Sequence, residues 1–150
     1  MKITDTIGLV LKSKGHTNVL SIAPDRLVFE ALEMMAEHDI GALLVLSGSK
    51  LEGILSERDY ARKGVLIGHL SKETEVRQIM SAQVVSVSTK HTVDECLGMM
   101  TQHRIRHLPV LKDDAVIGIV SIGDLVKWVI SGQEQTINDL HGYIAGAYPA

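Results

Sequence analysis

The second half of the chain changes its hydrophobic period several times, and each change marks a predicted element. Residues 84–88 (VVSVS) alternate apolar and polar positions, which predicts a short strand, and residues 92–103 place apolar side chains at helical spacing. Two apolar runs, 106–111 and 115–121, are expected to be strands around a Lys-Asp-Asp turn. With a last helix over about 122–131, the predicted order is β-α-β-β-α.

The first predicted helix of this half has a clear start. Thr92 and Glu95 stand at capping-box spacing, so each side chain can accept from a backbone N–H at the helix N-terminus. Apolar residues from Val93 to Met100 fall on one face, and the helix is expected to stop near His103.

The first half of the chain repeats this pattern. Sliding the sequence by 65 positions pairs residues 19–62 with 84–127 without a gap, and 16 of the 44 pairs are identical. Roughly two or three identities would arise by chance at ordinary abundances. The chain therefore contains a duplicated unit, whose first copy predicts a strand at 18–22, a helix at about 27–38, strands at 42–46 and 51–56, and a helix from Glu57.

The duplication predicts an α/β (α+β) fold in which two units pack through their sheets around a pseudo-twofold axis, because neither unit can bury its sheet alone. Additional helices are expected at about 4–14 and 133–145, and a short helix at the end of the segment between the copies. The predicted division is an N-terminal helix and lead-in strand (1–18), a first unit (19–66), a connector (67–83), a second unit (84–130) and a C-terminal helix and tail (131–150).

Composition narrows the class of protein. The chain is 45% hydrophobic and 22% charged, with a net charge of −3, so no overall charge draws it to nucleic acid or anionic lipid. No uncharged apolar run reaches 18 residues, which argues against a membrane span. The single cysteine, Cys96, cannot form an internal disulfide, which favours a cytoplasmic location. It lies in an apolar stripe and is expected to be buried.

One strand-to-helix junction is written twice, as GILSERD (53–59) and GIVSIGD (118–124). A structural interpretation makes each Ser an N-cap, each Asp its capping partner, and each Gly a site of close contact. A functional interpretation notes that junctions of paired units open onto the cleft between them, where helix N–H groups are free and a carboxylate can accept from two ribose hydroxyls.

These motifs resemble the tandem CBS-domain pair, or Bateman module, over about residues 14–130. The resemblance is carried by the duplication, by both junctions, and by HDIGALLVL and HRIRHLPVL after the first helix of each copy. It is closest to small stand-alone CBS-pair proteins of bacteria and plant organelles. The resemblance implies a binding module rather than an enzyme, with no catalytic residues and with AMP, ADP, ATP, NAD or S-adenosylmethionine as its usual ligands.

In such modules each junction faces early strands of the opposite copy, which implies two nucleotide sites. The first site would combine Ser56, Arg58, Asp59, Ser81, Val85, Ile105, Arg106 and His107. The second would combine Lys14, Gly15, His16, Thr17, Leu20, Ile40, Gly41, Ala42, Ser121, Ile122 and Asp124.

The two copies differ where a phosphate would lie. Residues 105–107 read Ile-Arg-His, whereas their counterparts 40–42 read Ile-Gly-Ala, and Arg58 has Gly123 as its counterpart. We therefore expect the first site to hold a phosphorylated nucleotide, with Arg58 and Arg106 donating to phosphate. The second site would be empty, weaker, or use Lys14 and His16 for charge. The alternative is that the basic residues near 104–107 only neutralise the preceding helix C-terminus.

The sequence leaves two functions open, and disfavours a third, an enzyme acting on nucleotides, because no nucleophile, base and orienting group assemble from its motifs. The leading hypothesis is an adenine-nucleotide sensor that regulates an unidentified partner protein, and the alternative is a constitutive dimeric scaffold whose junctions are only helix caps. The resemblance implies a homodimer, and the apolar C-terminal stretch 128–144 is a candidate interface. No metal site is expected, because His103 should end a helix and His107 should begin a strand, so their rings would diverge.

Overall fold

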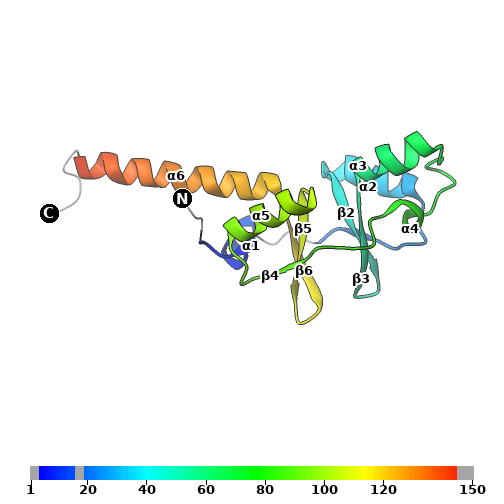
Figure 1. The fold of residues 1–150 in the computed structure, drawn as a ribbon, viewed down its shortest axis with the longest axis horizontal. Coiled ribbons are helices and arrows are strands. Elements are labelled where there is room, and N and C mark those ends of the chain that lie inside the picture. The colour runs from blue at the N-terminus through cyan, green and yellow to red at the C-terminus, as the bar shows by residue number, and fades with distance from the viewer. Residues whose placement is uncertain (1–3, 16–18, 145–150) are drawn as a thin grey trace.

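The computed structural model describes residues 4–15 and 19–144, and it contains two three-stranded sheets. Each sheet has one parallel and one antiparallel pair of strands, and the sheets lie side by side (Figure 1). The first sheet has the order β1 (Ser21–Ile22), β2 (Ala42–Ser47), β3 (Lys50–Ser56), and the second the order β4 (Val87–Ser88), β5 (His107–Lys112), β6 (Ala115–Ser121). The predicted α+β fold of two repeated units is confirmed.

The two sheets share one register at the 65-residue offset. Ala42 pairs with Ser56 in the first sheet, and His107 pairs with Ser121 in the second. Even the irregularity is repeated, between Val45 and Leu46 and again 65 residues later. The predicted first strands are wrong in length: only Ser21–Ile22 and Val87–Ser88 pair, because each of these strands meets a neighbour over two residues alone.

Each unit has one helix between its first and second strands. These helices are α2 (Val28–His38) and α5 (Val93–His103), as predicted. Both end on a residue in the left-handed region, Asp39 with φ 51° and Arg104 with φ 55°, whose backbone N–H closes the last turn. The predicted capping box of Thr92 and Glu95 is present, and the bonds from Thr92 hold the pKa of Glu95 below its usual value.

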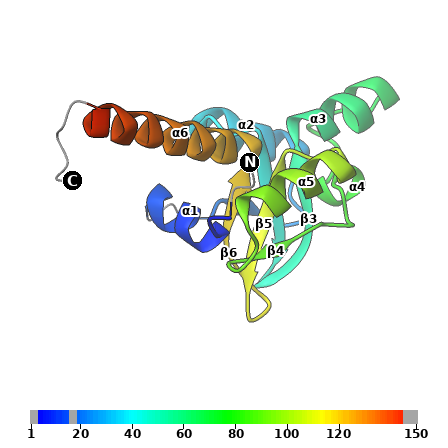
Figure 2. The same ribbon diagram turned by 60° about the vertical axis from the view of Figure 1, so that its left-hand side comes forward.

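The helices that follow each junction differ in length. After β3, α3 (Glu57–Asp59) continues as a π turn, η1 (Tyr60–Gly64), and a 3-10 turn, η2 (Val65–Ile67). After β6, α6 (Ile122–Ile144) is one helix of 23 residues that projects away from the body of the molecule (Figures 1 and 2). The prediction of two separate C-terminal helices is wrong, because Gly132 lies within the helix and does not break it.

Two short helices each precede one unit in the chain but pack on the other unit. α1 (Ile7–Lys14) begins the chain, yet Ile7 and Val10 belong to the core of the second unit, and Figure 2 shows α1 beside β6. α4 (Val76–Ile79) precedes the second unit, yet Val76 and Ile79 belong to the core of the first. The lead-in segments of the two units are therefore exchanged.

The exchanged segments are equivalent at an offset of 69 residues. The amide of Ile7 donates to the carbonyl of His91 at 2.8 Å, and the amide of Val76 donates to the carbonyl of Arg26 at 2.8 Å. Val93 N donates to Asp5 O at 2.9 Å, as Val28 N does to Thr74 O at 2.8 Å. This second, different offset explains why the 65-residue repeat begins only at residue 19.

Cys96 is fully buried in the core of the second unit, as predicted. Burial, with a smaller effect from the neighbouring Glu95 charge, raises the pKa of its thiol to about 11. Across residues 4–15 and 19–144, no helix has the length and hydropathy needed to cross a bilayer.

Candidate functional site

The first junction is a complete capping box. The backbone N and Oγ of Ser56 both donate to Asp59 Oδ2 at 3.0 Å, and Asp59 N donates back to Ser56 Oγ at 3.0 Å. The other carboxylate oxygen, Oδ1, accepts from Ser81 Oγ at 3.2 Å and lies 3.6 Å from Lys63 Nζ. Ser81 thus reaches the junction from the connector, as its place among the predicted site residues requires.

The second junction repeats the cap and adds a cation. Ser121 N donates to Asp124 Oδ2 at 2.8 Å, and Asp124 N donates to Ser121 Oγ at 3.0 Å. Lys14 Nζ donates to the same Oδ2 at 2.8 Å. Burial by itself would raise the pKa of Asp124, but the hydrogen bond and charge of Lys14, together with the bonds from Ser121, lower it overall.

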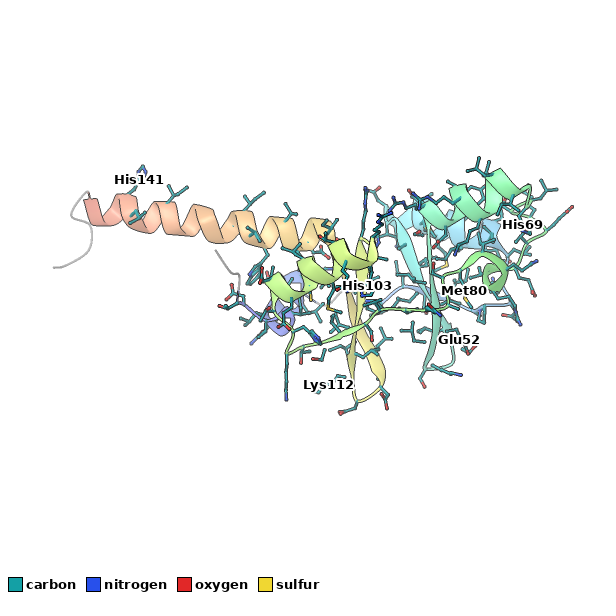
Figure 3. The ribbon with its side chains drawn as sticks, viewed as in Figure 1. Glu52, His69, Met80, His103, Lys112 and His141 are labelled. Carbon is teal, nitrogen blue, oxygen red and sulfur yellow. The ribbon has the colours of Figure 1, made fainter. Side chains whose placement is uncertain are left out.

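The junction glycines contact the chain itself. A Cβ placed on Gly53 would lie 2.7 Å from Met80 Sδ and 2.8 Å from the Ser81 carbonyl oxygen, and Figure 3 shows Met80 close to β3. A Cβ on Gly118 would lie 2.9 Å from a methyl of Leu11. The glycines therefore leave room for the exchanged segments to pack against the strands. This close contact explains the glycine of each junction without a ligand, as the structural interpretation expects.

A cleft of about 580 Å³ opens beside the first junction, between the two units. This volume lies within the range of small-molecule sites, roughly 300–1,000 Å³. Its lining contains all eight residues predicted for the first site: Ser56, Arg58, Asp59, Ser81, Val85, Ile105, Arg106 and His107.

This first cleft is strongly cationic. Arg58, Arg106 and three cations that sequence reasoning did not place in the site surround it, against two carboxylates, Glu57 and Asp59. Within the described residues, no ion pair holds the guanidinium of Arg58 or Arg106. The three additional cations are Arg62, Lys63 and Arg104. Arg62 and Lys63 follow the junction by one helical turn, a spacing that could have revealed them.

A second cleft, of about 640 Å³, opens beside the other junction. Its lining contains seven residues predicted for the second site: Lys14, Leu20, Ile40, Gly41, Ala42, Ser121 and Asp124. Gly15 and Ile122 lie outside this lining, and Ile122 N instead donates to the Arg106 carbonyl at 2.8 Å. His16 and Thr17 lie outside the described residues.

The second cleft carries a different charge. Among its described lining residues, Lys14 is accompanied by two carboxylates, Asp39 and Asp124, and by two histidines, His38 and His107. Gly41 and His107 line both clefts and so form a wall between them. Burial lowers the pKa of His107; the charge of Asp124 opposes this effect, and those of Arg106 and Lys14 add to it. The lowered pKa favours the neutral form of His107, and among the Lys, Arg, Asp and Glu side chains of the described lining one cation faces two carboxylates.

The two clefts therefore offer different chemistry. The first can place a ribose against Asp59, an apolar ring against Val85 and Ile105, and an anionic group among its arginines. The second presents a carboxylate that is hydrogen-bonded to the Lys14 ammonium at 2.8 Å, whereas the Lys63 ammonium lies 3.6 Å from Asp59. In the part of the chain that the structure describes, no group of three or more His, Cys, Asp or Glu side chains gathers as a metal ion requires.

Comparison with known proteins agrees with the duplicated architecture. The chain matches the CBS domain family twice, over residues 15–65 and 76–131. It is 39% identical over 151 residues to "CBS domain-containing protein CBSX3, mitochondrial" of Arabidopsis thaliana, and the match covers 95% of this chain and 73% of that protein. The crystal structure of the CBS domain protein NE2398 superposes with a TM-score of 0.80 at 50% identity, covering 83% of this chain and 97% of the other.

A more distant structure has the same fold. The CBS domain pair of protein MJ0100, solved in complex with 5′-methylthioadenosine and S-adenosyl-L-methionine, gives a TM-score of 0.72 at 23% identity and covers 87% of this chain and 98% of that one. Two matched segments, one fold and one repeated junction lead to the same assignment. The chain belongs to the CBS domain family, as a tandem pair of CBS domains.

Proposed function

We propose that this CBS pair binds an adenine nucleotide, AMP or a related ADP, ATP or NAD, in the first cleft. Asp59 accepts from the ribose hydroxyls, Arg58 and Arg106 donate to phosphate, and His107 assists them. Val85 and Ile105 contact the adenine ring. The observation that carries the proposal is the group of five cations around a cleft of nucleotide size, next to a junction carboxylate.

The solved CBS pair of MJ0100 supports the nucleoside part of the proposal. The CBS pair of MJ0100 was solved with two adenosine compounds, and it has the same arrangement of paired units. The preference for a phosphorylated ligand is supported by the charges of the cleft, where five cations face two carboxylates.

We propose a regulatory rather than a catalytic role, in which nucleotide binding changes contacts with a partner protein in the cytoplasm. A sensor requires that the ligand prefer one of two arrangements, and a ligand between two separately folded units can change their relative tilt. We further propose a homodimer, supported by apolar residues that repeat along α6 and are about half exposed, Ile130, Ile137 and Leu140.

The test is calorimetric titration of AMP and of adenosine into the Arg106→Ala variant. A charge-assisted hydrogen bond contributes about 1.5–3 kcal/mol, so the affinity for AMP should fall about 10- to 150-fold. The affinity for adenosine, which has no phosphate, should stay unchanged. Arg77→Ala is the matched control, because Arg77 is exposed on α4 and pairs with Glu75 away from the cleft.

Two results would contradict the proposal. An Arg106→Ala variant that binds AMP like the wild type would remove the phosphate assignment. A wild-type protein that binds none of AMP, ADP, ATP and NAD would favour the alternative, a constitutive scaffold in which both junctions serve only as helix caps.

A further inference from the structure

Lys14 makes, with one side chain, the contacts that Ser81 makes in the other cleft. In the first cleft, Ser81 N donates to the carbonyl of Ile54 at 2.9 Å, and Ser81 Oγ donates to Asp59 at 3.2 Å. In the second cleft, Lys14 Nζ donates to the carbonyl of Ile119 at 3.0 Å and to Asp124 at 2.8 Å. Ile54 and Ile119, like Asp59 and Asp124, are counterparts at the 65-residue offset, so the same carbonyl and the same carboxylate have different donors. Ser81 donates to Asp59 Oδ1, whereas Lys14 donates to Asp124 Oδ2, the oxygen that also accepts from Ser121 N.

The difference arises where the exchanged segments stop being equivalent. Leu11 and Met80 still correspond, since each lies on the glycine of its strand. After Met80 the chain becomes extended, and Ser81 pairs with Ile54 through both backbone bonds. After Leu11 the chain stays helical to Lys14, so its backbone turns away from β6 and only a long side chain reaches back.

We propose that Lys14 closes the second cleft to nucleosides, so that the protein binds one adenine nucleotide per chain, in the first cleft. Lys14 is then the residue that makes the two clefts of a duplicated fold different in specificity. This inference rests on the proposed function, because it assumes that the junction carboxylate is the group that receives ribose.

The contacts of Asp124 explain the closure. A ribose hydroxyl gains most from a carboxylate whose charge is not already shared, and Asp124 shares its charge with an ammonium at 2.8 Å. The side chains of both partners are only about a quarter exposed, 27% for Lys14 and 26% for Asp124, so water screens the pair incompletely. Asp59 instead accepts from the neutral hydroxyl of Ser81, which can rotate toward another acceptor when a ligand arrives. Its ammonium neighbour, Lys63 Nζ, lies farther away, at 3.6 Å from Oδ1, on a side chain that is 44% exposed.

A phosphate would not restore binding in the second cleft. Lys14 is the only cationic Lys or Arg among its described lining residues, and Asp39 and Asp124 are both anionic. A phosphorylated ligand that recruited Lys14 would leave Asp124 without its counter-ion next to the phosphate, so the charges of this cleft oppose the recruitment.

The experiment replaces Lys14 with glutamine, a neutral donor like Ser81, and counts sites by calorimetry with adenosine and AMP. The wild type should bind one equivalent per chain, which Asp59→Asn abolishes. Lys14→Gln should bind a second equivalent of adenosine, and the double variant Asp59→Asn/Lys14→Gln should retain that new site alone. Lys12→Gln is the matched control, because Lys12 lies exposed in the last turn of the same helix and should leave the count at one.

The outcomes separate this inference from the proposed function. Two equivalents in the wild type, or one in a Lys14→Gln variant that melts like the wild type, would overturn the closure and leave nucleotide binding intact. If the wild type binds no adenine compound, the proposed function fails, and the double variant still decides whether Lys14 closes the second cleft. Should Lys14→Gln fold poorly, Lys14→Met tests the same loss of charge with a side chain of similar length.

Discussion

Gly53 and Gly118 occupy the same place in the two units, yet replacing each with alanine should have different effects on stability. The added Cβ at Gly53 would lie 2.8 Å from the carbonyl oxygen of Ser81, a backbone atom that accepts from Ile54 N at 3.0 Å. The added Cβ at Gly118 would lie 2.9 Å from the end of the flexible Leu11 side chain. A methyl group can move aside, whereas the Ser81 carbonyl can move only if the pairing with β3 is disturbed.

The expected magnitudes follow from two opposing effects. Overpacking a core costs about 1–3 kcal/mol, while replacing glycine with alanine inside a strand gains roughly 0.5–1 kcal/mol. Gly118→Ala should therefore leave the free energy of unfolding within about 0.5 kcal/mol of the wild type. Gly53→Ala should lower it by about 1–2 kcal/mol, and it should also weaken nucleotide binding, because a displaced Ser81 cannot hold Asp59.

Urea unfolding of the two variants is the assay, with the free energies compared at an unchanged m-value so that both report the same transition. Equal destabilisation of the two variants would refute the reasoning. A Gly118→Ala variant less stable than Gly53→Ala would refute it as well, because that result would mean that the Leu11 side chain moves aside less easily than the Ser81 carbonyl.

Two further predictions concern pH and assembly. Because the pKa of His107 is lowered in the folded state, the unfolded chain takes up a proton first as the pH falls below about 6.5, and the free energy of unfolding should fall by up to about 1.4 kcal/mol per pH unit from this group. Unfolding measured at pH 7.5, 6.5 and 5.5 should therefore show a shallower decline for His107→Asn than for the wild type. An unchanged slope in the variant would contradict this assignment. Deleting residues 132–150 removes Ile137 and Leu140, so light scattering should show a weakened dimer, whereas an unchanged dimer would place the interface elsewhere.

The repeated body of the fold could be predicted because its signals are local. Apolar periodicity, the Thr92 cap and the 65-residue offset predicted the element order, and the register of the antiparallel strands follows that offset at every paired position. The lengths of β1 and β4 could not be predicted in this way, since the alternation of VVSVS continues beyond the residues that a neighbouring strand can reach. The continuity of α6 was missed for a similar reason: a glycine within a long helix lowers helix propensity only modestly.

The exchange of α1 and α4 had no such local signal. Residues 5–14 and 74–83 share no identical pair at their 69-residue offset, although their buried positions match in character, as Ile7 with Val76 and Val10 with Ile79. Equivalence here depends on backbone hydrogen bonds and burial, which any pair of branched apolar residues can satisfy. Comparing the two copies at one offset therefore finds the units but not the segments that complete them.

The same limit explains why the difference between the clefts was only partly visible. Ile-Arg-His against Ile-Gly-Ala, and Arg58 against Gly123, lie inside the 65-residue repeat, so the cationic character of the first cleft could be predicted from aligned positions. Lys14 and Ser81 lie outside it and do not correspond at either offset, because one acts through a helical side chain and the other through an extended backbone. Lys14 lies in the segment that precedes the first unit and packs on the second, and Ser81 lies in the segment that precedes the second unit and packs on the first. If Lys14 closes its cleft, the residue that leaves only one of two copies of the motif able to bind a nucleotide comes from neither copy, and aligning the copies cannot find it.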